Sequence, residues 1–417
     1  MYYRKFFWRA NSIALLLSLV TACGGGGNSV PAPTISTPEP ALNNVLGVTV
    51  DSGPVGTGNN VNRLYTAVKI CQPGTSQCQT IDHMLVDTGS SGVRFLAGVL
   101  APSLNLSRLT VGTSGLPLLN CVQFVDNTFA WGPVAKADIV LGGKLAPSVP
   151  IQVIADPAFN TPASACAVGG TAITTAALLG ANGILGIGLF KEDCGSGCAS
   201  SSRMGFYYTC TDASCTATKG ALASLDQQVK NPVPLFASDN NGVLIDLPAA
   251  GSAADVSLSG SLIFGIGTQA NNQLSPAGVL TTDASGYFTT LLAGQSLSKS
   301  FFDSGSNGLF FDSATVPNCS ANSGAGFYCP SSPLNLSATL VGANAARIAV
   351  SFQIDNATAL FTDASKTVLP GLAGPMGDRT AFDWGLPFFY GRRMFFGIEG
   401  QAATLGTSTV TGPYYAF

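Results

Sequence analysis

Charged residues are scarce in this sequence: Asp, Glu, Lys and Arg together make up only 10% of its 417 residues. Disordered chains combine high net charge with few apolar residues, whereas 46% of this chain is apolar. A protein that binds nucleic acid would be expected to carry a basic patch, and the sequence has none. We therefore expect a folded protein with no nucleic-acid partner.

Histidine is scarcer still, because His83 is the only one in the chain. Catalysis by a Ser-His-Asp triad needs a histidine beside the nucleophile, and many metal sites need two or three. With one histidine, a Ser-His-Asp triad could form only around His83, and a metal site with two or three histidines could not form. We expect neither a cofactor nor a bound metal.

Glycine, in contrast, is abundant at 49 residues, and short runs of Val, Ile, Leu and Phe recur along the chain. Short apolar runs bounded by turn-forming residues are typical of strands. In residues 64–70, alternation places Leu64, Thr66, Val68 and Ile70 on one face of a predicted strand. The sequence therefore predicts an all-β fold.

The N-terminus has the features of a targeting segment. Three basic residues precede the apolar run 13–20, which is too short to span a membrane. The run Val20-Thr21-Ala22-Cys23 resembles a bacterial lipobox. This resemblance implies that residues 1–22 are a lipoprotein signal peptide and that Cys23 carries lipid. The alternative is an ordinary signal peptide that is cleaved near Ala22.

A lipid on Cys23 would anchor the protein to a bilayer. Several acyl chains together hold a protein durably at a membrane. Residues 23–45 would then comprise the lipidated cysteine and a flexible tether rich in Gly, Pro, Ser, Thr and Asn. Gly24 follows the cysteine where inner-membrane lipoproteins carry Asp, so the resemblance favours the outer membrane of a bacterial envelope, facing the periplasm or the surface. Removal of three basic residues leaves 16 basic and 22 acidic residues, a net charge of −6.

The other ten cysteines form an even set, which suits disulfides in an oxidising compartment. Their spacing does not fix the connectivity. The preferred pairs are Cys71 with Cys78, Cys121 with Cys166, Cys194 with Cys198, Cys210 with Cys215, and Cys319 with Cys329. A zinc site of Cys194, Cys198, Cys210 and Cys215 is the alternative, and it ranks below disulfides in an exported protein.

One acidic motif occurs twice. Asp87-Thr88-Gly89-Ser90-Ser91-Gly92 follows an apolar run, and 216 residues later Asp303-Ser304-Gly305-Ser306-Asn307-Gly308 follows another. A repeat at this separation predicts two similar halves, each contributing one acid. Two adjacent carboxylates cannot both stay ionised, so one keeps a proton. Such a pair can act as general acid and general base on one water.

The repeated hydrophobic-hydrophobic-Asp-Thr/Ser-Gly-Ser motif resembles the pepsin-like aspartic peptidase family. Residues 181–188 resemble the family's hydrophobic-hydrophobic-Gly segment, and residues 382–389 are its counterpart. The resemblance implies an all-β, bilobal pepsin-like acid protease fold with a central cleft between two similar β-rich lobes, 46–268 and 269–417. It also implies an aspartic endopeptidase that acts as a monomer on peptides or unfolded proteins.

The resemblance assigns roles to single residues. Asp87 and Asp303 would bind the attacking water, and Trp131, followed by glycine, would take the place of the flap tyrosine. The supporting residues would brace the two loops or donate hydrogen bonds to the carboxylates: Thr88, Gly89, Ser90, Ser304, Gly305 and Ser306. For Trp131 the alternative is a side chain in the core.

Two other functions compete with the peptidase. A catalytically weak or inactive pepsin-like scaffold could bind peptide or glycan at the envelope, since a fold does not fix a function. The altered flap residue keeps this alternative open. A metal-dependent adhesion domain ranks last, because it needs Asp-x-Ser-x-Ser and the glycines at 89 and 305 occupy the wrong place.

Overall fold

Strands account for most of the regular structure in this computed structural model, which describes residues 43–251, 254–274, 278–320, 324–406 and 408–417. The all-β prediction is confirmed. Cys23, the signal peptide and nearly all of the proposed tether lie outside the described residues. The helices of the described residues are single turns, and none of them is long enough to cross a bilayer.

The strands up to residue 220 are β1 (Val45–Val50), β2 (Leu64–Cys71), β3 (Cys78–Asp87), β4 (Ser91–Leu96), β5 (Leu118–Gln123), β6 (Thr128–Leu141), β7 (Lys144–Ile154), β8 (Thr171–Ala172), β9 (Gly183–Ile187), β10 (Tyr207–Cys210) and β11 (Thr218–Gly220). The strands that follow are β12 (Gly242–Asp246), β13 (Leu258–Phe264), β14 (Val279–Thr281), β15 (Phe288–Leu292), β16 (Gln295–Asp303), β17 (Leu309–Phe311), β18 (Leu334–Val341), β19 (Arg347–Ile354), β20 (Ala373–Gly374), β21 (Ala381–Gly385), β22 (Arg393–Gly397), β23 (Ala402–Leu405), β24 (Ser408–Thr411) and β25 (Tyr414–Ala416).

The helical turns are α1 (Ala176–Leu179), α2 (Ser196–Ser200) and α3 (Ala357–Leu360), with 3-10 turns η1 (Ala97–Val99), η2 (Pro157–Phe159), η3 (Val233–Leu235), η4 (Ala270–Asn272) and η6 (Leu386–Phe388). Side chains cap α1 and α3: Thr175 Oγ1 accepts from the Leu178 amide, and Asn356 Oδ1 accepts from the Ala359 amide. Such caps satisfy amides that have no partner within the helix.

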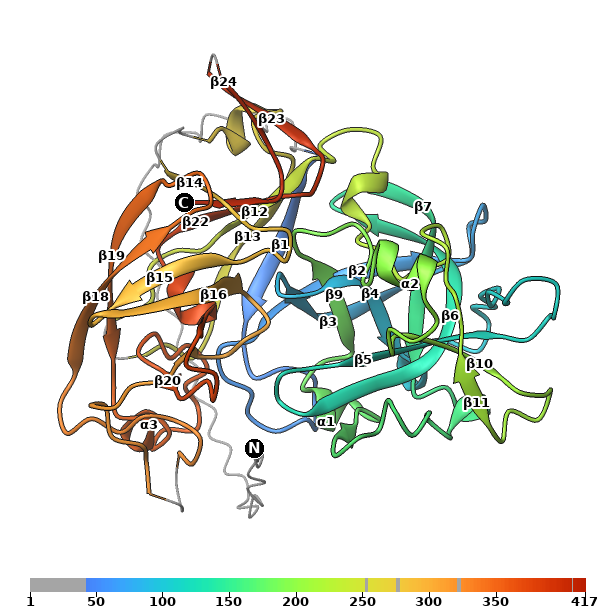
Figure 1. Cartoon of the computed structure of the whole chain (residues 1–417), viewed down its shortest axis with the longest axis horizontal. Helices are drawn as coiled ribbons and strands as arrows, with labels where there is room; N and C mark the ends of the chain where they lie inside the picture. The colour runs from blue at the N-terminus through green and yellow to red at the C-terminus, as the bar shows by residue number, and fades with distance from the viewer. Residues whose placement is uncertain (1–42, 252–253, 275–277, 321–323, 407) are drawn as a thin grey trace, which may run out of the picture.

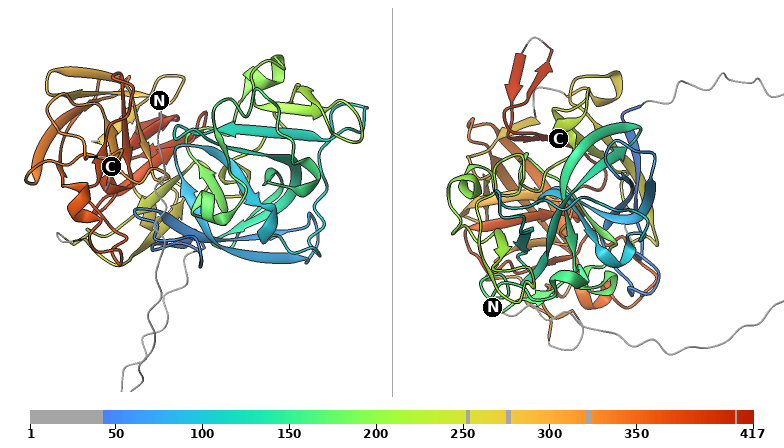
Figure 2. Two further views of the ribbon diagram at one scale, coloured as in Figure 1. Left: turned by 90° about the horizontal axis from the view of Figure 1, so that it is seen from below. Right: turned by 90° about the vertical axis from the view of Figure 1, so that its right-hand side faces the viewer.

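The strands form a 16-stranded sheet, a seven-stranded sheet and the separate β23–β24 hairpin. The large sheet runs in the order β11-β10-β5-β6-β7-β4-β9-β3-β2-β1-β13-β12-β22-β25-β14, with β8 beside β6. The smaller sheet runs β19-β18-β15-β16-β21-β17-β20. Below, the first half means β2 to β11 and the second half means β15 to β21. Figures 1 and 2 show them side by side, with β1, β12, β13 and β22 between them.

Both halves contain the same local arrangement of strands. In the first half, β9 pairs parallel with β3 and antiparallel with β4, so it lies between the strands that flank the Asp87 loop. In the second half, β21 pairs parallel with β16 and antiparallel with β17 around the Asp303 loop. The registers agree, because Asp87 lies opposite Gly186 and Asp303 lies opposite Gly385. The sequence repeat is therefore a repeat of three-dimensional structure.

Apolar side chains along these strands form the core. In β2 the predicted inward face is buried, whereas Ala67 and Lys69 point to solvent. In the second half, aromatic rings fill the space under the Asp303 loop. Trp384 stacks on Phe382 with ring centroids 3.9 Å apart, and its indole N–H donates to Thr290 Oγ1 at 3.0 Å. Packing of rings with a satisfied indole donor holds β16 and β21 in one position.

The five disulfides have the predicted pairing: Cys71–Cys78, Cys121–Cys166, Cys194–Cys198, Cys210–Cys215 and Cys319–Cys329. Cys71–Cys78 closes the hairpin between β2 and β3, directly before the strand that ends at Asp87. The zinc alternative is wrong for its four cysteines, because their sulfurs are bonded to one another in two disulfides and are not thiolate ligands.

Candidate active site

Asp87 and Asp303 are the last residues of β3 and β16, and each follows buried apolar residues. Asp87 is 6% exposed, Asp303 is half-buried, and Gly89 beside them is exposed. The apolar residues keep the strands in the core, and the following glycine and serine let the chain turn at the surface. Each carboxyl therefore lies at a strand end, between the interior and solvent.

One backbone amide joins the two carboxyls. The Gly89 N–H donates to Asp87 Oδ1 at 2.9 Å and to Asp303 Oδ1 at 3.1 Å. The structure thus brings together two acids that are 216 residues apart in the sequence.

The remaining hydrogen bonds follow the repeat. Asp87 accepts from the Ser90 amide at 3.1 Å and from Ser90 Oγ at 2.5 Å. Asp303 accepts from the Gly305 amide at 2.7 Å and from Ser306 Oγ at 2.8 Å. Donors of this kind stabilise a carboxylate and fix its orientation.

The hydroxyl residues after each acid connect the two loops. Thr88 Oγ1 accepts from the Ser304 amide at 2.9 Å, and Ser304 Oγ accepts from the Thr88 amide at 3.1 Å. Ser304 Oγ also donates to the Val86 carbonyl at 2.7 Å. Both side chains are at most 3% exposed. Because buried polar groups depend on such partners, this reciprocal brace fixes one loop against the other.

Both glycines occupy places where a side chain would not fit. A Cβ on Gly89 would lie 2.5 Å from Asp303 Cγ, and a Cβ on Gly305 would lie 2.8 Å from Asp87 Oδ1. Neither position requires a positive φ. The glycines are needed because each lets the carboxyl of the other half approach the backbone.

Burial and mutual repulsion set the charge of the site. Burial, and then the neighbouring Asp87 carboxylate, raise the pKa of Asp303 to about 7, although hydrogen bonds from Ser306 and Gly305 oppose the shift. At acidic to neutral pH the site therefore holds a proton on Asp303. A carboxyl that keeps its proton in this range can act as a general acid.

Trp131 lies in the β5–β6 hairpin, opposite Cys121, but its side chain points into the core. It is 5% exposed in β6, packs edge-on against Tyr208, and its indole N–H donates to the Phe159 carbonyl at 2.9 Å. The single indole donor is used inside a buried cluster with the Cys121–Cys166 disulfide. The flap prediction is corrected by this packing, and the core alternative describes the residue.

Two residues of the site were missed by the sequence analysis. Asn62, fully buried at φ +49°, donates to the carbonyls of Asn307 and Leu369, both at 2.8 Å. It thereby ties the segment before β2 to the loop that carries Asp303. Asp383 lies under that loop, 1% exposed, with its Oδ2 in hydrogen-bonding contact with Ser306 Oγ at 2.5 Å. An acid inside the apolar run of residues 381–386 was a signal for Asp383; nothing local marks Asn62.

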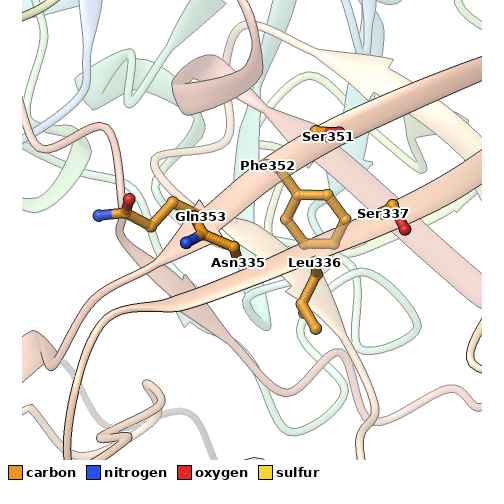
Figure 3. Close-up of a pocket in the computed structure, with 6 residues that line it drawn as sticks. All are labelled: Asn335, Leu336, Ser337, Ser351, Phe352 and Gln353. Atoms are coloured by element: carbon orange, nitrogen blue, oxygen red, sulfur yellow. The ribbon is translucent and has the colours of Figure 1, made fainter.

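A separate concavity of about 440 Å³ lies over β18 and β19 (Figure 3). Its lining residues are Asn335, Leu336, Ser337, Ser351, Phe352 and Gln353. It shares no residue with the carboxylate site, and it contains no charged side chain. Among the described residues, no group of three or more His, Cys, Asp or Glu side chains is placed to hold one metal ion.

Fold and site together define an all-β protein with a duplicated acidic loop. A family model described as "Protein of unknown function (DUF3443)" matches residues 40–417, and the chain belongs to this family. No curated protein matches the sequence.

Proposed function

We propose that this protein is an aspartic endopeptidase of the pepsin-like kind, which hydrolyses peptide bonds with a water held between Asp87 and Asp303. The observation that carries the proposal is the Gly89 amide, which donates to one carboxyl from each half within 3.1 Å. A single water can reach two acids only when they are this close.

The proposal includes a bilobal pepsin-like fold with lobes 46–268 and 269–417 and a cleft between them. The support is the repeat of strand, acidic loop and strand around β9 and around β21, with matching register. The cross-brace between Thr88 and Ser304 gives further support, since it joins the loops at the place where such lobes would meet.

The chemistry follows from the protonation of the pair. The Asp87 carboxylate takes a proton from the water as the water oxygen attacks the peptide carbonyl carbon, and Asp303 donates its proton to the carbonyl oxygen. The product is a neutral gem-diol. Asp87 then gives its proton to the amide nitrogen, and one hydroxyl of the gem-diol returns a proton to Asp303. The C–N bond breaks in this step. The products are an acid and an amine, and the pair regains its single proton.

An envelope location fits this activity. We propose an outer-membrane lipoprotein that is anchored through Cys23 and faces the periplasm or the surface, with peptides or unfolded proteins as substrates. Five disulfides among the described residues suit an oxidising compartment. Mass spectrometry of Cys23, together with membrane fractionation of a Cys23→Ser variant, tests the anchor: an unmodified Cys23 and unchanged fractionation would contradict it.

The activity is tested with the purified protein and an unfolded protein pool across the pH range. We expect cleavage with a bell-shaped pH dependence, inhibited by pepstatin, a peptide that mimics the transition state. The alkaline limb should report the raised pKa of Asp303. Binding of peptide or glycan without cleavage at any pH would instead favour a scaffold without turnover.

A further inference from the structure

A third acid is linked to the pair through one hydroxyl. Ser306 Oγ lies 2.8 Å from Asp303 Oδ2 and 2.5 Å from Asp383 Oδ2. Asp383 belongs to β21, pairs with Phe301 and Phe310, and is 1% exposed. Its other oxygen, Oδ1, is buried and has no hydrogen-bond partner among the described residues.

The number of protons determines which hydrogen bonds can form between Asp303, Ser306 and Asp383. Two short contacts meet at Ser306 Oγ, but a hydroxyl carries only one proton and can donate to only one carboxyl at a time. The second contact is a hydrogen bond only if one of the two carboxyls carries a proton and donates it to the serine oxygen. Two ionised carboxylates around this hydroxyl would leave one contact repulsive.

Burial identifies Asp383 as the carboxyl that donates. The groups that act on it are Asp303 from the end of β16, Asp87 from the end of β3 and, on β25, Tyr415; on β17 the residue opposite is Phe310. None of these is a cation. Burial, and then the charges of Asp303 and Asp87, raise the pKa of Asp383 well above its usual range. An ionised Asp383 would also carry an unpartnered oxygen in the interior, which is costly.

We propose that Asp383 is a positioning residue of the carboxylate site: a neutral acid that donates to Ser306 Oγ and so turns the serine proton toward Asp303. This inference rests on the proposed peptidase function for its catalytic meaning, but the protonation of Asp383 does not depend on that function: it rests on the two short contacts at Ser306 Oγ and on the burial of Asp383. The site then holds one more proton than the Asp87–Asp303 pair itself.

The first half offers an internal comparison. Ile184 in β9 occupies the place of Asp383, since each lies opposite the second residue before its aspartate, Leu85 or Phe301. An isoleucine cannot donate to Ser90, whose hydroxyl bonds directly to Asp87. The additional proton therefore belongs only to the Asp303 side.

Infrared spectroscopy tests the protonation without any need for activity. At about pH 8, above the pKa of about 7 for Asp303, we expect a protonated carboxyl band that is absent from Asp383→Asn. The difference spectrum is needed because burial also raises the pKa of Asp193. The exposed Asp363 gives the matched control, since Asp363→Asn should leave the band unchanged. A wild-type spectrum identical to that of Asp383→Asn would overturn the inference.

Should Asp383→Asn fail to fold, Ser306→Ala provides a second test. Removing the acceptor should shift the Asp383 band toward the frequency of a carboxyl without a hydrogen bond. An unshifted band would show that Asp383 does not donate to Ser306, and the inference would be wrong.

The dependence of kcat/KM on pH gives a further test, because this dependence would not change if Asp383 had only a structural role. Asn is also a neutral donor, so Asp383→Asn should keep the alkaline limb of kcat/KM within about 0.3 pH units. Were Asp383 ionised in the wild type, the same change would remove a negative charge and move the limb down by about one unit or more. Asp383→Leu removes the donor altogether, and we expect kcat to fall about five- to tenfold. A protein with no peptidase activity would contradict the proposed function and leave the infrared result as the test of this inference.

Discussion

In both acidic loops the hydroxyl of the serine three residues after the aspartate contacts Oδ2 of that aspartate, but the residue on the other side of the serine differs. Behind Ser90 the equivalent position is Ile184, whereas behind Ser306 it is Asp383, which contacts the serine oxygen at 2.5 Å. The backbones of the two loops repeat closely. The hydrogen bonds from the aspartate nevertheless end at Ser90 in the first half, whereas in the second half they continue through Ser306 to Asp383 in the core. A duplicated backbone therefore does not impose duplicated chemistry.

Substitution of Asp87 or of Asp303 should have the largest effect of the changes considered, and the effect should be on kcat. We expect Asp87→Asn and Asp303→Asn each to lower kcat by about 10²- to 10⁴-fold, because each removes one of the two proton-transfer groups. The double variant should be little worse, since in the proposed mechanism the two acids act as one unit. Steady-state kinetics on a peptide substrate check this. Loss of activity in only one of the two variants would contradict a shared water.

The raised pKa of Asp303 should also make the stability of the protein depend on pH. Between the ordinary value of 3.8 and about 7, folded Asp303 keeps a proton that the unfolded chain has released. Its stabilising contribution is therefore complete below about pH 4 and is lost as pH rises toward 7. The loss is at most about 4 kcal/mol, because one pKa unit corresponds to about 1.4 kcal/mol.

Urea unfolding at several pH values, with the disulfides intact, measures this dependence. Asp303→Asn should remove the part of the decline that this carboxyl contributes, and the raised pKa values of Asp383 and Asp193 leave the rest. Asp87→Asn should reduce the contribution of Asp303 only in part, because burial still raises the pKa of Asp303 when its charged neighbour is gone. Equal declines in the wild type and in Asp303→Asn would argue that this carboxyl is not the group that keeps the proton.

The two loop glycines allow a steric comparison. Ala at position 89 would place Cβ 2.5 Å from Asp303 Cγ, whereas Ala at position 305 would place it 2.8 Å from Asp87 Oδ1. We expect each change to destabilise the protein by about 1–3 kcal/mol, with the larger loss at position 89. Gly47 in β1 is the control, because its added Cβ would meet nothing within 4 Å. If all three variants melted at one temperature, the two loops would not be in contact.

The two side chains of the cross-brace, Ser304 and Thr88, should show the smallest difference in stability when each is substituted. Ser304 Oγ makes two short hydrogen bonds, at 3.1 and 2.7 Å, whereas Thr88 Oγ1 makes one at 2.9 Å and a long one at 3.5 Å. Ser304→Ala should therefore destabilise more than Thr88→Val, each by about 1–3 kcal/mol, since a buried amide loses its partner. A double-mutant cycle measures the coupling. Additive effects would mean that the two hydroxyl groups do not support each other.

Most of the architecture near the acids could be predicted from residues that act locally. Apolar runs before each aspartate and glycines after it encode strand and turn, because side-chain alternation and backbone freedom depend on only a few neighbours. The five disulfides were also predicted correctly, since most join cysteines a few residues apart across a turn. Trp131 was assigned wrongly to a flap, because whether a ring faces the core depends on Tyr208 and Phe159, which come later in the chain.

By itself the sequence determined that two acidic loops exist and that each acid ends a buried strand. Only the tertiary structure decided that one amide, Gly89, contacts both acids, that Asn62 ties down the second loop, and that Asp383 lies behind Ser306. The physical reason is the distance dependence of the forces involved. Hydrogen bonds and carboxyl repulsion act over a few ångströms in space, and segments more than 200 residues apart come that close only after the two sheets have formed.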